Sequence, residues 1–591
     1  ARGARAAAPA DTSAARAARA VTPADTSAAR PESLAVRAPG ATGVHPVPPV
    51  DRGPLPLAAA TGGFRLGSAA PARQAPGEAE DRYFRSYPDR LAEAGWIADT
   101  DYGWTGLERY LFAPGSPRPP AMSLDGFPLD LGWPATSDLE GWGGEPLASG
   151  QAWWPDPPAA PAPMGALDLE RYPAGNGALL SRVSLHGEDL GGMDARVQFA
   201  RQDPDAEWSL ATGVRKETAS YLVSEFRERG LSVEASRKTR WGRWRAAVLS
   251  STSDVVAYAP DFSGTDVRRE LLRVGLGAAS RDSGVSVAAV LASAGDGTSS
   301  DGRQALVARV RLPGRPALAA LGELEGGGGL SGGARPSVGL AAGGPGREAA
   351  VLLGLGGGRH ELALRGSERW EISSSFAAGA EGCLRADLGG VPADSQRFSM
   401  LRLEPQLQWT RGRIRAQLQA YLERDRGLPG ASDAPRFSTL LPAAVREASS
   451  VGLEGRLELP GPLGTRLGMS GLVQRTRDEH GWRLPFQPPV SGHAFVALDH
   501  RTPWVPMLAH LRLTAHAEGD RRGEQNVVSD GHATLDFETV LDYGALHLQV
   551  AFYNFTDLVY QTTFVVPGQS GVAAPAAGRA MRFGITWDLW D

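Results

Sequence analysis

The residues with the clearest chemical potential are histidines near the end of the chain, accompanied by acidic and basic residues. His510, His516 and His532 fall on the polar sides of segments in which polar and apolar residues alternate. Imidazole and carboxylate groups can bind a metal ion or a metal chelate, but on neighbouring strands they also pair with one another. We favour a polar interior wall, because the spacing of His510 and His516 matches no metal motif, and we assign no metal ligand and no cofactor. The candidate patch comprises His493, His510, Arg512, His516, His532, Asp536, Glu538 and His547.

The rest of the sequence predicts neither catalysis nor nucleic-acid binding. The single cysteine, Cys383, cannot form an internal disulfide or a thiolate metal cluster. The glycine runs at 326–329 and 356–358 lack the Lys-Ser/Thr tail of a phosphate-binding loop. A net charge of -5 over 591 residues argues against a nucleic-acid partner, which normally selects a strong basic excess. We therefore expect a protein that is not an enzyme.

The elements that carry the candidate patch are predicted to be β-strands. From about residue 191 to the end, segments in which apolar and polar residues alternate follow one another, separated by Gly, Pro, Asp and Ser. The segments 401–410 and 413–423 show this alternation best, and Arg411-Gly412 is predicted to be the two-residue turn that joins them. The same pattern recurs at 450–459, 509–516 and 532–538.

The length and polarity of these segments favour a transmembrane β-barrel over a soluble sandwich. Each run has roughly 9–11 residues, which is enough for a tilted strand to cross a bilayer, whereas sandwich strands average about 5–6 residues. Their polar faces carry charges of both signs, which suits a wet interior. Since a bilayer tolerates no open sheet edge, such strands must form a closed barrel. The sequence contains no run of 18 or more apolar residues, so it predicts no transmembrane helix.

The last segment, 579–591, resembles the terminal-strand signal of bacterial outer-membrane barrels. Polar residues alternate there with apolar and aromatic ones, and the chain departs from the pattern only by ending one residue after Trp590. The resemblance implies outer-membrane lipids as the surroundings and the barrel-assembly machinery as a partner during biogenesis. The residues that match the signal are Arg582, Gly584, Trp587 and Leu589.

Further motifs resemble those of one particular family of outer-membrane barrels. The segment 552–557 with the trailing Tyr560-Gln561, and then Gly578-Arg579, is similar to the last turn and strand of TonB-dependent receptors. The segment 123–129, which contains Asp125 and Gly126, is similar to a motif in the plug domain of that family, and 167–177 is similar to the plug's exit. The resemblance implies an all-β fold: an antiparallel barrel of about 22 strands with a small N-terminal α+β plug.

We expect three regions along the chain. Residues 1–75 are rich in Ala, Arg, Pro and Thr and are predicted to be a disordered segment in the periplasm. Residues 76–190 form the plug, with a short helix within 78–96, and residues 191–591 form the barrel, integral to the outer membrane. The aromatic residues of the plug either form a ligand-stacking apex or pack against the barrel wall, and we favour packing. These residues are Trp133, Trp142, Trp153 and Trp154.

The family resemblance implies ligand-gated uptake of a scarce or bulky solute of the siderophore, cofactor or oligomer class, driven through a TonB-type partner. Two observations favour a different function. The first 75 residues contain no clear TonB box, and about 400 barrel residues leave little sequence for extracellular loops. The alternative is a non-transporting barrel that is a structural or docking component of an outer-membrane assembly, with a lipoprotein or other partner. A passive porin is a third possibility.

Overall fold

A computed structural model describes two parts of the chain. Ahead of the barrel it describes residues 97–101, 108–112, 114–115, 121–124, 127–128, 147–153 and 166–171. From 179 to 590 it describes all residues except 189–191, 220–223, 258–264, 281–284, 296–299, 312–317, 328–334, 345–346, 357–358, 390–398, 427–446, 502–504, 506, 524–526, 566–572 and 577. Within these residues, no helix has the length and hydropathy of a membrane span.

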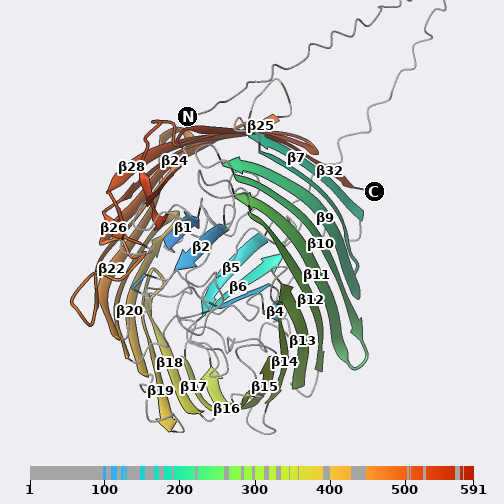
Figure 1. Cartoon of the computed structure of the whole chain (residues 1–591), viewed down its shortest axis with the longest axis vertical. Helices are drawn as coiled ribbons and strands as arrows, with labels where there is room; N and C mark the ends of the chain where they lie inside the picture. Colours follow the sequence, from blue (N-terminus) through green and yellow to red (C-terminus); the bar gives the residue numbers. More distant parts are fainter. Residues whose placement is uncertain are drawn as a thin grey trace, which may run out of the picture. The chain divides into compact units, whose positions relative to one another are not determined.

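Twenty-two antiparallel strands form one closed barrel, as predicted (Figure 1). Their order around the barrel follows the sequence from β7 to β25, then β28, β29 and β32, which pairs back with β7. The first half consists of β7 (Leu179–Glu188), β8 (Met193–Gln202), β9 (Ala206–Ala219), β10 (Ser224–Thr239), β11 (Gly242–Ala257), β12 (Thr265–Ser280), β13 (Val285–Gly295), β14 (Ser300–Arg311), β15 (Leu318–Gly327), β16 (Arg335–Gly344) and β17 (Arg347–Gly356). The second half consists of β18 (Arg359–Ser373), β19 (Phe376–Gly389), β20 (Ser399–Arg411), β21 (Ile414–Arg426), β22 (Glu447–Pro460), β23 (Thr465–Asp478), β24 (Val490–Arg501), β25 (Met507–Glu518), β28 (His532–Tyr543), β29 (Leu546–Tyr553) and β32 (Ala580–Trp590).

The barrel starts earlier than the sequence pattern suggested. Its first strand begins at Leu179, within the range 76–190 that we had assigned to the plug. The segment 180–188 pairs with β32 along its whole length, so it is needed to close the barrel. The sequence pattern did not reveal this role, because the partner strand lies about 400 residues away.

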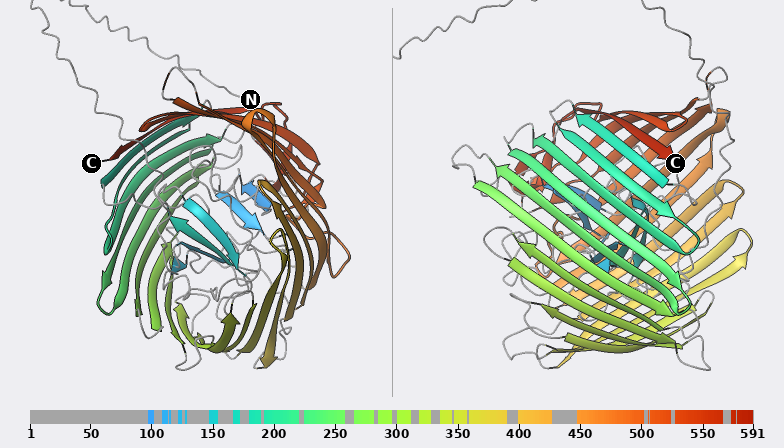
Figure 2. Two further views of the ribbon diagram at one scale, coloured as in Figure 1. Left: turned by 180° about the vertical axis from the view of Figure 1, so that it is seen from behind. Right: turned by 90° about the vertical axis from the view of Figure 1, so that its right-hand side faces the viewer.

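The described residues ahead of the barrel form short strands. Strands β1 (Ile97–Asp101) and β2 (Glu108–Phe112) pair with each other. A four-stranded sheet consists of β3 (Ala121–Leu124), β4 (Phe127–Pro128), β5 (Leu147–Trp153) and β6 (Ala166–Arg171), and β3 runs parallel to β6. Both views in Figure 2 show these strands within the ring of barrel strands. The helix expected within 78–96 lies outside the described residues.

Alternation along each strand separates an apolar outer face from a polar inner face. In β20, Leu401, Leu403 and Leu407 are exposed, whereas Arg402 and Glu404 between them are buried. The terminal strand β32 shows the same pattern: Phe583, Ile585, Trp587 and Leu589 are exposed. A soluble protein would bury its apolar face, so this inverted pattern is that of a barrel whose outer face meets lipid. As predicted, the alternation along each strand determines which side chains face outward and which face the barrel interior.

The hairpin between β20 and β21 differs from the prediction by one residue. The turn consists of Gly412 and Arg413, not of Arg411 and Gly412, because Arg411 still pairs with Ile414. Gly412 has φ 61°, and a glycine at the first central position is what a type II′ turn requires. Shifting the turn by one residue moves each cross-strand partner by two, so both strands keep the predicted faces.

The two ends of the barrel differ in the length of their connections (Figure 2). We call one end the short-turn end, because tight turns such as those between β10 and β11, β20 and β21, and β28 and β29 lie there. At the other, long-loop end, the connections from β21 to β22, β23 to β24, β25 to β28 and β29 to β32 are long. Two of them contain small sheets, formed by β26 (Arg521–Arg522) with β27 (Val528–Ser529) and by β30 (Gln561–Val565) with β31 (Ala573–Pro575).

Exposed tryptophans gather near the short-turn end. They lie in or beside its turns, where an indole ring can lie at the boundary between hydrocarbon and water. Such a belt fixes the height of the barrel in a bilayer. The residues are Trp208, Trp241, Trp244, Trp370 and Trp587.

Candidate functional site

A turn just after β2 is held against the inner wall near the long-loop end. The backbone nitrogen of Gly115 donates a hydrogen bond to Oε1 of Gln487 at 2.9 Å, and its carbonyl accepts one from Oγ of Ser450 at 2.6 Å. Nη1 of Arg402 donates to the carbonyl of Pro114 at 3.1 Å. Three separate parts of the barrel therefore bind the two residues of this turn, and we call the set the plug-turn site.

Only glycine fits at position 115. Its φ is 79°, a region that L side chains rarely adopt. A Cβ atom there would also lie 2.4 Å from Cε2 of Tyr421, whose ring is almost fully buried. Sequence analysis missed this site. The Pro-Gly dipeptide does signal a turn, but it says nothing about which strands the turn contacts.

Arg402 is the ionic centre of the plug-turn site. Its guanidinium forms ion pairs with Glu404 on its own strand and Glu423 on β21, and all three side chains are buried. It also lies 4.9 Å from the centre of the Tyr421 ring. The two carboxylates fix the guanidinium so that one nitrogen remains directed at the plug turn. An arginine in this position can hold or release a backbone carbonyl without changing its own ion pairs.

A chain of amides connects the plug turn to the long loops. Tyr421 donates to Oε1 of Gln474, and Nε2 of Gln474 donates to Gln487 at 3.2 Å and to the carbonyl of Pro488 at 2.7 Å. Gln487 and Pro488 belong to the connection between β23 and β24. A displacement of that connection would therefore reach the plug turn directly.

The connection between β23 and β24 is in turn anchored to its neighbour. Phe486 is fully buried with φ 60°, and its nitrogen donates to the carbonyl of Arg522 at 2.7 Å. The Arg522 guanidinium stacks 4.3 Å from the exposed ring of Trp482. Burial lowers the pKa of Arg522, and the nearby Asp478 carboxylate acts in the opposite direction. An exposed indole thus lies in the same connection as Gln487, the residue that bonds to the plug turn.

The predicted histidine patch divides into groups along the inner wall. Near the long-loop end, Nδ1 of His493 contacts Nδ1 of His516 at 2.6 Å, and Nε2 of His516 lies 2.9 Å from Asp536. His532 stacks on Tyr560 at 3.8 Å and lies 4.0 Å from Glu518. Among the described residues, no group of three or more His, Cys, Asp or Glu side chains has the geometry of a metal site.

The other members of the patch lie farther along the strands. Arg512 stacks 4.0 Å from the Phe495 ring, and Glu538 is fully buried at the position opposite Arg512. At the short-turn end, His510 lies between Asp499 at 2.8 Å and Asp542 at 3.0 Å. These contacts between neighbouring strands are those expected of a polar wall.

Charged pairs also join the first and last barrel strands. Arg182 of β7 makes two hydrogen bonds of 2.6 Å to the carboxylate of Asp588 in β32. His547 of β29 links this pair to the His510 group, since it lies 2.6 Å from Asp542 and 3.9 Å from Asp588. The seam of the barrel is therefore fixed by side chains as well as by the backbone ladder.

The two parts of the motif near the end of the chain meet in the structure. Asn554, at φ 47°, bonds through its side chain to both the nitrogen and the carbonyl of Leu558. Asp557 then accepts a hydrogen bond from the nitrogen of Arg579 at 2.9 Å. The turn 554–558 and the Gly578-Arg579 pair thus together position the start of β32. Of the predicted signal residues in that strand, Arg582 and Gly584 fall on the inner face and Trp587 and Leu589 on the outer face.

The predicted plug residues are mostly outside the described part of the chain. Trp133, Trp142, Trp154, Asp125 and Gly126 are not among the described residues. For Trp153 the backbone is described as the last residue of β5.

Residues 329–333, Gly-Leu-Ser-Gly-Gly, have the spacing of a nucleophile elbow. They lie outside the described residues, between β15 and β16, which pair with each other as antiparallel barrel strands.

Comparison with known proteins supports the fold. No protein-family model and no curated protein matches the sequence. Among solved structures, the ferric yersiniabactin uptake receptor FyuA of Yersinia pestis matches with TM-score 0.59 at 12% identity, over 85% of this chain and 95% of that one. The ferric preacinetobactin receptor BauA of Acinetobacter baumannii matches with TM-score 0.65 at 11% identity, over 88% and 97%. The FrpB iron transporter of Neisseria meningitidis (F5-1 variant) matches with TM-score 0.67 at 9% identity, over 86% and 98%. The chain therefore has the plugged-barrel fold of the TonB-dependent receptors.

Proposed function

We propose that this protein is an outer-membrane receptor that takes up a scarce or bulky solute when ligand binding releases its plug. The observation that carries the proposal is the plug-turn site, where Gly115 is bonded to Ser450 and Gln487. Because Gln487 belongs to a long loop, a ligand that moves the loop changes a hydrogen bond to the plug. Gating of this kind needs such a contact between the ligand-binding side and the plug.

The class of solute is part of the same proposal. The structural relatives are named for ferric siderophores or iron, which supports a siderophore ahead of a cofactor or an oligomer. In this proposal the long-loop end faces the exterior, and the N-terminal segment lies in the periplasm and engages a TonB-type partner. A barrel has no nucleotide site of its own, so the energy must come from that partner.

A docking function without transport is the second candidate. Half of the barrel has short connections even at the long-loop end, for example from Gly295 to Ser300 and from Gly356 to Arg359. Short connections leave that half of the rim with little sequence to enclose a ligand, and they favour a flat surface that a lipoprotein or other partner can cover.

Planar-bilayer conductance tests the proposal. The full-length protein is compared with a variant that lacks residues 1–178 and therefore keeps β7. A closed full-length protein that opens on deletion is the expected result. Open channels in both forms would identify a passive porin. A second assay measures binding of residues 1–75 to the C-terminal domain of a TonB protein, and absence of binding would favour the docking function.

A further inference from the structure

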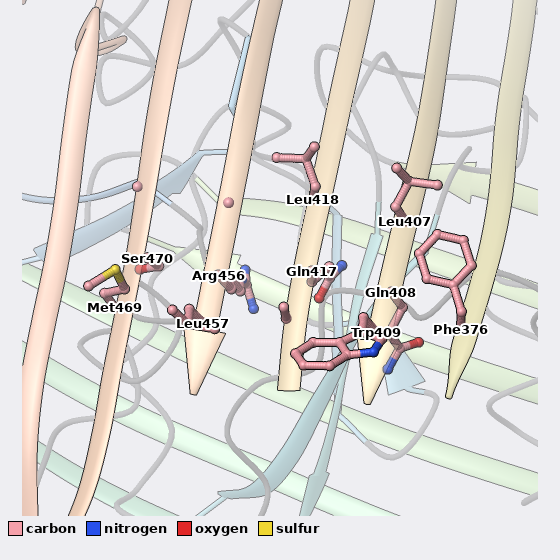
Figure 3. A pocket seen from close by; sticks show the side chains of 13 residues that line it. Phe376, Leu407, Gln408, Trp409, Gln417, Leu418, Arg456, Leu457, Met469 and Ser470 are labelled. Carbon is pink, nitrogen blue, oxygen red and sulfur yellow. The ribbon is translucent and has the colours of Figure 1, made fainter. Parts of the chain in front are cut away.

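A depression of about 570 Å³ lies in the outer wall of the barrel next to the short-turn end (Figure 3). It spans β19 to β23, and its exposed surface is mostly apolar, although four polar residues also border it: Gln408, Gln417, Arg456 and Ser470. The depression is on the outer face, because Leu407, Leu418 and Met469 at its edge are exposed members of the apolar faces of their strands.

The depression results from small residues in neighbouring strands. Gly455 pairs with Leu418 on one side and with Gly471 on the other, so two adjacent positions of the wall lack side chains. Larger residues surround this floor, among them Trp409 and Leu457. Phe376 is opposite Trp409 across β19 and β20, and Figure 3 shows both side chains near the same end of their strands. The result is an apolar groove with an aromatic edge toward the short-turn end.

Two arginines lie just beyond the aromatic edge. Arg411 follows Trp409 by two residues and so falls on the same outer face, and Arg413 is in the turn itself. Both side chains are exposed, and neither forms an ion pair within the described part of the chain. By register, the nearest acidic residue is Glu458, which is opposite Arg415 on the inner face. Positive charge at the end of the groove is therefore uncompensated on the outer side.

We propose that this groove binds an anionic phospholipid, with an acyl chain over Gly455 and Gly471 and the phosphate between Arg411 and Arg413. The volume lies within the range of roughly 300–1,000 Å³ that is typical of small-molecule sites. Guanidinium groups bind phosphate oxygens through paired hydrogen bonds, and tryptophan favours the level of the lipid headgroups. The proposal goes beyond uptake and requires only that the barrel spans a membrane.

Charge favours a lipid over a second copy of the chain as the occupant. A twofold contact through this groove would bring Arg411 and Arg413 of one copy toward the same residues of the other. Four cations would then face one another, which is unfavourable. An anionic headgroup removes this repulsion.

Native mass spectrometry of the full-length protein in nanodiscs of phosphatidylglycerol and phosphatidylcholine tests the proposal. We expect the wild type to retain phosphatidylglycerol over phosphatidylcholine by roughly tenfold or more, since each arginine contributes to anionic-lipid binding. R411Q/R413Q should abolish this preference. G455L/G471L should lose the retained lipid altogether, because leucine side chains fill the groove. A Cβ at either glycine meets nothing closer than 3.8 Å, so the filled variant should fold.

The control removes two positive charges beside another turn at the same end. R237Q/R240Q alters the end of β10 and its turn to β11: Arg237 is exposed and opposite the exposed Trp244, and Arg240 lies 4.8 Å from the Trp241 ring. If R237Q/R240Q reduces lipid retention as much as R411Q/R413Q does, general surface charge explains the effect and the proposal is wrong. A wild-type dimer that G455L/G471L dissociates would identify a second copy as the occupant and also overturn it. Heat-modifiable mobility on electrophoresis confirms that each variant is folded.

Discussion

At the residue scale, the fit of Gly115 makes the plug-turn site sensitive to one methyl group. We expect Gly115→Ala to weaken the closed state, because Cβ would meet the Tyr421 ring at 2.4 Å and the backbone at φ 79° would be strained by about 1–2 kcal/mol. Single-channel conductance of the full-length protein measures this as more frequent opening.

Gly412 offers a matched control for that substitution. It also has a positive φ, 61°, but no atom lies within 4 Å of its Cβ position. Gly412→Ala should therefore also strain the backbone but leave the channel closed. Equal leakage from both variants would mean that backbone strain anywhere loosens the protein, and the plug-turn contact would not be responsible.

Arg402 should contribute to stability mainly by neutralising its two carboxylates. Arg402→Met leaves Glu404 and Glu423 buried without their cation, and breaking a buried pair in this way costs about 3–5 kcal/mol. The triple variant R402M/E404Q/E423Q should recover most of that loss, since it removes the uncompensated charge. Urea unfolding in lipid vesicles, followed by tryptophan fluorescence, gives the free energies. A triple variant as unstable as the single one would contradict this account.

At the element scale, the seam between β7 and β32 should depend on its side-chain pair. Asp588→Asn removes the negative charge that accepts both hydrogen bonds of the buried Arg182, so we expect the folded band on electrophoresis to convert to the unfolded band at a lower temperature. Asp203→Asn is the control, because its pair with Arg201 at 3.1 Å is exposed and should contribute only about 0–1 kcal/mol. Equal shifts in the two variants would show that burial of the seam pair is unimportant.

The strands themselves show what the sequence could and could not predict. Alternation of apolar and polar residues placed Leu403 outside and Glu404 inside, because a side-chain period of two needs no knowledge of the partner strand. The turn at Gly412 was displaced by one residue, since the same faces pair in either register. The contact of Gly115 with Ser450 and Gln487 could not be predicted at all. It joins positions more than 300 residues apart, and no periodicity encodes such a contact.

The candidate patch illustrates the same limit. The polar faces around His510 and His516 were predictable, and a polar wall was the preferred interpretation. The strand tilt and length then separate these residues, so that His510 bonds at the short-turn end and His516 at the other. Which of these residues contact one another depends on the pairing of β24, β25 and β28, which the sequence pattern does not give.

At the scale of the whole molecule, closure of the barrel sets a strict limit on truncation. In hydrocarbon an unpaired backbone group costs several kcal/mol, so a barrel with an open seam is not stable in a bilayer. Strand β7 supplies the partners of β32 along most of its length, from Arg582 opposite Glu188 to Trp590 opposite Leu180. A chain that begins at residue 179 retains this ladder, whereas a chain that begins at residue 191 has lost it.

We therefore expect the two truncations to behave oppositely, because the residues by which they differ, 179–190, contain the whole of β7. Deletion of 1–178 should give a heat-modifiable, folded band in lipid vesicles. Deletion of 1–190 should give none, because β8 and β32 would each present an unpaired edge to lipid. A folded band from the shorter chain would mean that β8 can close the barrel with β32. Failure of both chains would mean that the plug is needed for folding, and the contacts of Gly115 with the wall would then stabilise the barrel as well as close it.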